Sequence, residues 1–189
     1  MDYAHIGRLV ESQLKVKDIA MIYRHIAGVD VKAHFSDCLK YRYRLDISLK
    51  SSTMGSRKVV CAIMQNPSIA NSEIADKSVQ FLEKLIFTKG VSQFSDTSKL
   101  IVVNQFAFIQ TNDFLGNDEH IGGLNDESIS QAVNESDVVL IAWGSGNRYE
   151  ARKTVINKIL QKYRGKLLLQ GKSHPSRASY TDYISMYYI

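Results

Sequence analysis

The apolar residues of this chain follow two spacings, one typical of buried strands and one typical of helices. Nearly continuous apolar runs predict strands at residues 59–65, 100–108, 138–143 and 167–170. Apolar residues that recur every three or four positions predict helices at residues 72–89, 125–134 and 148–163. This alternation predicts an α/β fold: a three-layer αβα sandwich around a central, mainly parallel four-stranded sheet.

The chain upstream of these elements carries two further patterns. Residues 1–27 have apolar positions at helical spacing, and Gly28 suits the position just past a helix end. We therefore expect an N-terminal helical extension over residues 1–39 and an α/β domain over residues 40–189. Residues 41–49 alternate strictly, with Tyr41 and Tyr43 on one face and Arg42 and Arg44 on the other, which predicts a half-exposed strand.

Composition narrows the class of protein. The chain has 189 residues, 44% of them hydrophobic, and a formal charge of +5, with a pI near 9.1. The charge weakly favours an anionic partner such as DNA or nucleotides. No apolar run is long enough to span a membrane and no signal peptide is evident, so we expect a cytoplasmic protein without membrane contact.

Cofactor and metal chemistry find little support in the sequence. Two cysteines, Cys38 and Cys61, are too few for a disulfide framework or a metal cage. The histidines show no metal-ligand spacing, and neither a Walker A loop nor a Gly-x-Ser-x-Gly elbow is present. We expect no metal and no cofactor.

The two prolines of the chain occur in similar tripeptides, Asn66-Pro67-Ser68 and His174-Pro175-Ser176. Each tripeptide follows a predicted buried strand, and proline cannot continue inside a central strand. Each therefore marks an exit at the carboxyl edge of the sheet, where ligands bind in open α/β folds. The first tripeptide is equally compatible with a plain turn. In the second, His174 can donate a hydrogen bond to developing negative charge, while Ser176 and Arg177 can hold a phosphate.

Two other segments carry candidate chemistry. Asn104 is a lone amide in a buried strand, where it either pairs with a neighbouring loop or reads a ligand such as a base edge. The segment from Gly144 to Gly146 allows close approach of a backbone or a phosphate, but a tight turn explains it equally. Basic residues at positions 40–58, Arg42 and Arg44 among them, form either a solvated face or a nucleic-acid footprint.

Four ordered segments suggest a family. They are residues 63–68 (Ile-Met-Gln-Asn-Pro-Ser), 102–107 (Val-Val-Asn-Gln-Phe-Ala), 139–144 (Val-Leu-Ile-Ala-Trp-Gly) and 174–176 (His-Pro-Ser). Together with residues 41–45 and Asp76, they resemble a bacterial and phage family of unknown function numbered 1643. The resemblance covers about residues 40–180.

The same skeleton is similar to the uracil-DNA glycosylase superfamily. This resemblance implies that Asn66 positions the attacking water, that Asn104 reads the base and that His174 stabilises the oxygen of the departing base. It places Ser68 and an aromatic ring, Phe106 or Phe108, in the base pocket. It implies that Arg177 or a neighbour enters the gap left in the duplex. Asn66 is neutral where many members of the superfamily carry an acid.

The expected function is accordingly base excision from DNA, or base recognition, at a site built from Asn66, Asn104 and His174. Base excision requires the nucleotide to leave the base stack. Two alternatives remain open at this point. One is a nucleotide or nucleic-acid binding module without catalysis, and the other is an enzyme that acts on modified nucleotides.

Overall fold

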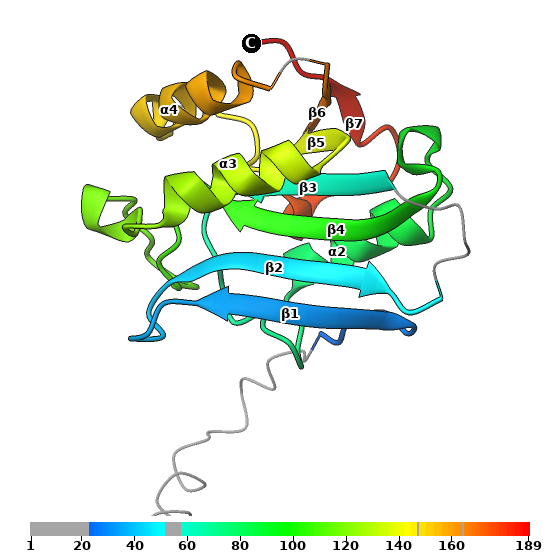
Figure 1. The fold of residues 1–189 in the computed structure, drawn as a ribbon, viewed down its shortest axis with the longest axis horizontal. Helices are drawn as coiled ribbons and strands as arrows, with labels where there is room; N and C mark the ends of the chain where they lie inside the picture. The colour runs from blue at the N-terminus through cyan, green and yellow to red at the C-terminus, as the bar shows by residue number, and fades with distance from the viewer. Residues whose placement is uncertain (1–22, 52–57, 147, 164) are drawn as a thin grey trace, which may run out of the picture.

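The computed structural model describes residues 23–51, 58–146, 148–163 and 165–189. They form one seven-stranded sheet with three α-helices packed on it (Figure 1). The strands are β1 (Val29–Phe35), β2 (Arg42–Leu49), β3 (Lys58–Met64), β4 (Thr97–Asn104), β5 (Val138–Ile141), β6 (Leu167–Gly171) and β7 (Ile184–Met186). The helices are α2 (Lys77–Phe87), α3 (Asn125–Glu135) and α4 (Glu150–Leu160), with single 3₁₀ turns η1 (Ser92–Phe94), η2 (Asp118–His120) and η3 (Pro175–Arg177).

The sheet is mixed, with strand order β1-β2-β4-β3-β5-β6-β7. Strands β4, β3, β5 and β6 pair in parallel, whereas β1, β2 and β7 join the two edges by antiparallel pairing. The mixed α/β class is confirmed. The prediction of a mainly parallel sheet of four strands is wrong, because three of the six pairings are antiparallel and seven strands take part.

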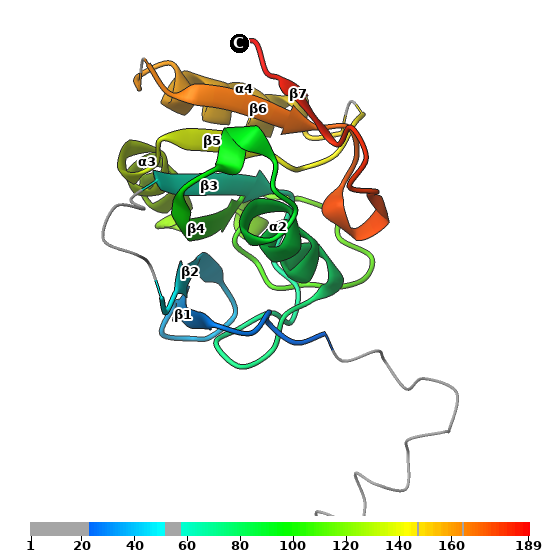
Figure 2. The ribbon, with the colours of Figure 1, turned by 90° about the vertical axis from the view of Figure 1, so that its right-hand side faces the viewer.

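Side-chain alternation along the central strands creates two hydrophobic layers. Val60, Ala62 and Met64 of β3 face the layer that contains α2. Cys61 and Ile63, at the positions between them, face the layer that contains α3 and α4. The helices therefore cover both faces of the sheet, with α2 behind it in Figure 1 and on the opposite side from α3 in Figure 2. This two-sided burial explains why the central strands are continuously apolar.

Helix α2 begins later than the apolar spacing predicts. The side chain of Asn71 accepts hydrogen bonds from the backbone amides of Glu73 and Ile74, at 2.8 and 3.0 Å, which holds residues 71–75 in a turn. Asp76 then caps the helix by accepting a hydrogen bond from the amide of Val79 at 2.8 Å. The irregular stretch keeps the β3–α2 loop at the carboxyl edge of the sheet.

The predicted N-terminal helical extension divides into two parts. Residues 1–22 lie outside the described residues. Residues 23–28 contain no helix, and Val29–Phe35 form strand β1 of the sheet instead of a helix. Gly28, with a φ of +82°, begins the hairpin with β2 because its carbonyl accepts from the amide of Lys50.

Strand β2 departs from strict alternation at one residue. In the pairing with β1, His34 lies opposite Arg44 and Phe35 lies opposite Arg42, so Tyr43 is an extra residue in a β-bulge. The bulge turns Arg42 into the interior on the same side as Leu45, and the Arg42 side chain is fully buried. The prediction that Arg42 lies on an exposed face is therefore wrong.

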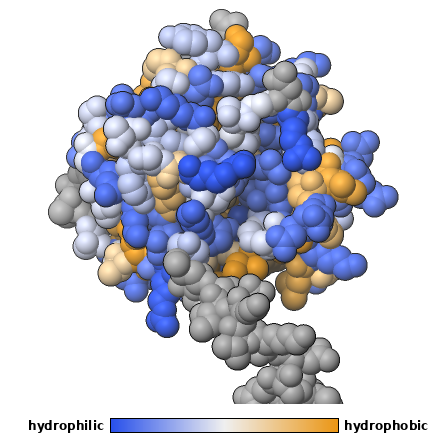
Figure 3. All heavy atoms as spheres, turned by 180° about the vertical axis from the view of Figure 1, so that it is seen from behind, coloured by the Kyte–Doolittle hydropathy of each residue, from blue (hydrophilic) through white to orange (hydrophobic). Residues whose placement is uncertain are grey.

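The face of the molecule on which α2 lies is mainly polar. Figure 3 shows the side on which α2 lies, where hydrophobic residues form only small separate patches. No helix among the described residues is long and apolar enough to cross a membrane.

Candidate functional site

The carboxyl ends of β3, β4, β5 and β6 meet at one edge of the sheet, where two adjoining pockets lie. The first, here called the amide pocket, has a volume of about 460 Å³ and lies between the β3–α2 loop and the loop that follows β6. The second, here called the glycine pocket, has a volume of about 480 Å³ and includes Gly144 and Gly146 after β5. The pockets share four lining residues: Gln65, Arg148, His174 and Arg177. Both volumes suit a small ligand.

Asn66 lines the amide pocket. Its amide nitrogen donates to the carbonyl of Gln110 at 2.6 Å and to that of Pro67 at 3.2 Å. These two bonds fix the orientation of the amide and leave its oxygen as an acceptor, with only a long 3.4 Å contact from Gln65. Ser68 also lines this pocket, and its hydroxyl contacts that of Thr111 at 3.1 Å. The Asn66 oxygen can hold a water or a ligand donor, but it cannot act as a strong base.

His174 lines both pockets, and its neighbours determine its tautomer. The Nδ1 atom accepts from the backbone amide of Ser176 at 3.3 Å and lies 2.9 Å from the Ser176 hydroxyl. A neutral ring must then carry its proton on Nε2. Burial lowers the pKa of His174, and Arg177 lowers it further, while Asp76 acts in the opposite direction. The ring is therefore a neutral donor at neutral pH.

The loop that carries His174 is held by its surroundings. Tyr183 donates from its hydroxyl to the carbonyl of Ser173 at 2.9 Å, and a Cβ on Gly171 would lie 2.3 Å from that hydroxyl oxygen. Tyr180 stacks on Phe81 of α2 with ring centroids 4.4 Å apart. Gly144 has a φ of +89°, which strains other residues, and a Cβ there would also lie 3.2 Å from the backbone nitrogen of His174, so this position favours glycine.

Asn104 does not reach either pocket. It is 1% exposed, and its side-chain oxygen accepts from the Arg42 guanidinium at 3.2 Å. The side chain from this strand end that lines the glycine pocket belongs to Gln105, whose buried oxygen has no partner among the described residues. Successive residues of a strand face opposite sides, so a shift of one position moves the amide from the core to the site. The prediction that Asn104 lies in the pocket is wrong.

The aromatic ring of the amide pocket also differs from the prediction. Phe106 is buried against Phe114 and Tyr149, with ring centroids 5.2 and 5.0 Å apart, and does not line the amide pocket. Phe108 stacks on His120 instead, at 4.8 Å. Phe114 does line the amide pocket. Its position directly after the polar segment of residues 110–113 is the one sequence signal for it.

The two arginines of β2 are occupied by the protein itself. Arg42 donates to the carbonyl of Ala70 at 2.7 Å and to Asn104, and burial lowers its pKa to about 10. Arg44 pairs with Asp46 at 2.8 Å and with Glu135 at 2.6 Å, and these partners raise its pKa. Arg42 is therefore buried and bound by the protein, and Arg44 has two carboxylate partners.

Basic residues at the pockets are arranged differently. Lys77, Arg148 and Arg177 line the amide pocket, and none of them forms an ion pair with another described residue. Asp76 is the single carboxylate among the described residues that line this pocket. Three cations against one carboxylate favour an anionic ligand. Arg148 and Asp76 are site residues that motif reasoning did not assign.

No group of three or more histidine, cysteine or acidic side chains that could hold a metal ion occurs in the described part of the chain. The described residues that line the amide pocket offer amides, hydroxyls, one imidazole, one carboxylate and three cations.

Comparison with known proteins identifies one family. The family described as "Protein of unknown function (DUF1643)" matches residues 42–177, a range that holds both proline tripeptides and all four central strands. The chain belongs to this family. No curated protein and no solved structure matches it.

Proposed function

We propose that this DUF1643 protein binds a nucleotide of DNA at the amide pocket and hydrolyses the N-glycosidic bond of its base. The observation that supports the proposal most directly is that one pocket contains both a neutral His174 donor and the Asn66 oxygen, whose one contact with a described residue is the 3.4 Å contact from Gln65. The resemblance of the four strand-end motifs to the uracil-DNA glycosylase superfamily points to the same reaction.

The reaction makes two demands that these residues meet. As the bond breaks, positive charge develops on the sugar and negative charge on the base, much as in glycoside hydrolysis. A donor at His174 Nε2 would stabilise the oxygen of the departing base, and such a contribution is worth about 3–4 kcal/mol in oxyanion holes. The Asn66 oxygen would orient the attacking water. Water is the only co-substrate.

The rest of the pocket suits a base with attached phosphates. Phe114 and Tyr23 supply rings on which a planar heterocycle can stack, and Ser68 and Gln110 supply polar edges. Arg148 and Arg177 lie on the wall shared with the glycine pocket, where they could neutralise phosphates. Gln105, in place of Asn104, is the amide available to read a ligand that reaches the glycine pocket.

The test is a search for abasic sites. The protein is incubated with oligonucleotides that carry deaminated or modified bases, and alkali-labile cleavage is measured for single-stranded and duplex forms. Cleavage that depends on His174 supports the proposal.

Two other outcomes would replace it. Salt-dependent DNA binding without any abasic product would identify a binding module. Release of bases from free nucleotides, but not from DNA, would identify an enzyme of modified nucleotides.

A further inference from the structure

The amide pocket contains one carboxylate, Asp76, whose place in the fold leaves one oxygen available to a ligand. One oxygen, Oδ1, caps helix α2 by accepting from the amide of Val79 at 2.8 Å. The second, Oδ2, forms no hydrogen bond with another described residue. The cap fixes the direction of the carboxylate, and Asp76 lines the pocket with no hydrogen bond from Oδ2 to another described residue.

The charge of Asp76 acts on two other groups at this edge of the sheet. It opposes the effect of burial on the pKa of His174 and on the pKa of Arg42. Asp76 therefore lies within electrostatic reach of both the imidazole and the buried guanidinium. The carboxylate that caps helix α2 thus also lines the pocket that contains His174 and Asn66.

No other described group that lines the pocket can take a proton from water. The Asn66 amide is not basic, and Nδ1 of His174 is occupied by Ser176. The remaining charged groups there, Lys77, Arg148 and Arg177, are cations. Hydrolysis at neutral pH gains from a positioned base, and the carboxylate of Asp76 is the group of that kind.

We propose that Asp76 is the general base of this site, an inference that rests on the proposed function. The water oxygen bonds to C1′ of the sugar while the C1′–N bond breaks, and the electron pair of that bond leaves with the base. The proton of the water moves to Oδ2 of Asp76. The departing base, held by Nε2–H of His174, later takes up one proton, and the carboxylate returns to its charged form.

The experiment separates the charge of Asp76 from its capping role. Asparagine caps helices as well as aspartate does, so Asp76→Asn keeps the bond to Val79 and removes only the negative charge. Asp76→Ser is a second capping variant without charge. The matched control is Asp137→Asn, because Asp137 also accepts from a backbone amide, that of Val59 at 2.8 Å, and lines neither pocket.

Single-turnover rates of base release and DNA affinities are measured for the full chain and for each variant. We expect Asp76→Asn and Asp76→Ser to slow base release by about 100-fold or more. Their DNA affinity should be unchanged or higher, since a negative charge is lost, and Asp137→Asn should match the unaltered protein. Rates of both Asp76 variants within about threefold of the unaltered protein would overturn the inference and leave the proposed function intact.

A second readout does not need activity. The His174 ring is titrated by NMR in the unaltered protein and in Asp76→Asn. Loss of the negative charge should lower the pKa of His174, because Asp76 raises it while burial and Arg177 lower it. An unchanged titration would show that Asp76 does not face this ring. If the unaltered protein releases no base from any substrate, the proposed function fails and the inference fails with it.

Discussion

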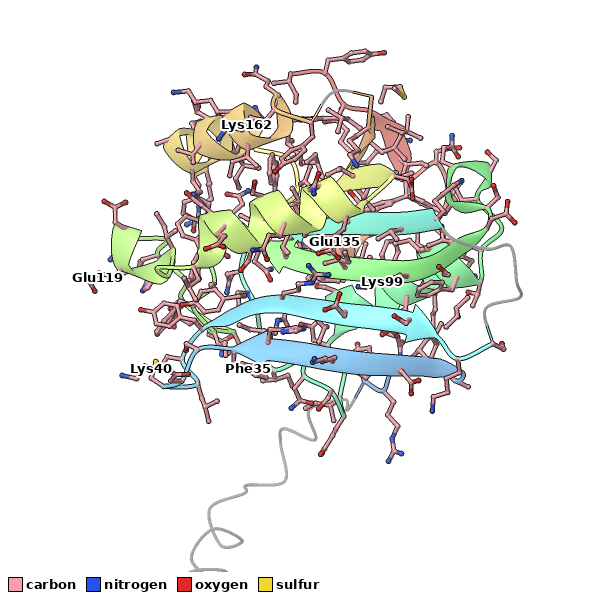
Figure 4. All side chains as sticks on the ribbon, viewed as in Figure 1. Phe35, Lys40, Lys99, Glu119, Glu135 and Lys162 are labelled. Carbon is pink, nitrogen blue, oxygen red and sulfur yellow. The ribbon has the colours of Figure 1, made fainter. Side chains whose placement is uncertain are left out.

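Two groups of basic residues in this molecule differ in what neutralises them. On the sheet beside α3, Arg44 and Lys99 surround Asp46 and reach Glu135, at distances of 2.6–3.7 Å. Figure 4 labels two of these residues, Lys99 on β4 and Glu135 at the end of α3. At the amide pocket, Lys77, Arg148 and Arg177 have no carboxylate partner among the described residues. The first group is satisfied by the protein and stabilises a surface. The second is left for a ligand.

Within β2, two arginines separated by one residue are both bound by the protein but differ in depth and in the kind of partner. Arg44 lies among carboxylates near the surface, whereas the bulge at Tyr43 buries Arg42 against the β3–α2 loop. A buried guanidinium bound to the Ala70 carbonyl positions the loop that carries Asn66 and Ser68. Both arginines are therefore structural, and the sequence pattern alone does not separate the one near the surface from the one in the interior.

The largest effect that we expect at the amide pocket is that of His174→Ala. We expect base release to slow by about 100- to 1000-fold, because the donor to the departing base is lost. Asn66→Ala should cost less, since a neutral amide only orients water. Single-turnover rates on an oligonucleotide substrate measure both. Equally small effects of the two variants would count against an enzyme at this site.

Arg42→Met tests the structural side. The Ala70 carbonyl and the Asn104 oxygen would lose a buried donor, and we expect a loss of about 2–4 kcal/mol of unfolding free energy. Urea denaturation measures this loss. Arg44→Met is the matched variant, with a smaller expected loss of about 1 kcal/mol because its ion pairs are partly solvated. A larger loss for Arg44→Met than for Arg42→Met would contradict the assignment.

The pocket cations are tested by Arg148→Ala and Arg177→Ala. Each should weaken DNA binding and reduce the slope of log affinity against log salt by about 1, since one phosphate contact is lost. Stability should not change. Lys99→Ala serves as the control, because Lys99 pairs with Asp46 at 3.0 Å and does not line the pockets. An equal effect of Lys99→Ala on DNA affinity would contradict the inference that only the cations at the amide pocket bind phosphates.

The smallest expected effect concerns pH. His25 lies 2.5 Å from the Glu83 carboxylate and 2.9 Å from the Asn71 carbonyl, so both ring nitrogens donate. Burial opposes the charged ring, but Glu83 and Asn71 outweigh it, and the pKa of His25 is raised. Stability from this contact is complete below the unfolded pKa of about 6.5 and is lost as pH rises through the higher folded pKa.

The unfolding free energy, measured from below pH 6.5 to above the raised pKa of His25, tests the contact between His25 and Glu83. The His25→Gln variant should flatten the dependence. A dependence of the same size in that variant would assign the effect to other groups.

The sequence predicted the central strands and two walls of the site for a simple physical reason. Continuous apolar runs mark strands that are buried on both faces, and a proline directly after such a run marks its exit. Asn66 and His174 were found in this way, and both line the amide pocket.

The assignments that failed depend on register, which spacing alone does not determine. The bulge at Tyr43 reversed the face of Arg42, and one position separates the buried Asn104 from Gln105 at the glycine pocket. Strand β1 was missed because the helical spacing before Gly28 was extended through it. Asp76 was noticed after the first motif but was given no role, and only the three-dimensional arrangement places it in the same pocket as His174.

The contacts of Tyr180 and Tyr183 have a practical consequence for handling this protein. The loop with the imidazole is tied to a tail that runs past it, through a phenol bound to the Ser173 carbonyl and a ring stacked on α2. Shortening the chain before residue 183 would release that loop without touching a ligand-binding side chain. A truncated protein without activity would therefore show the effect of a displaced His174 loop and not of a lost ligand contact. Assays are best performed with the C-terminal residues intact.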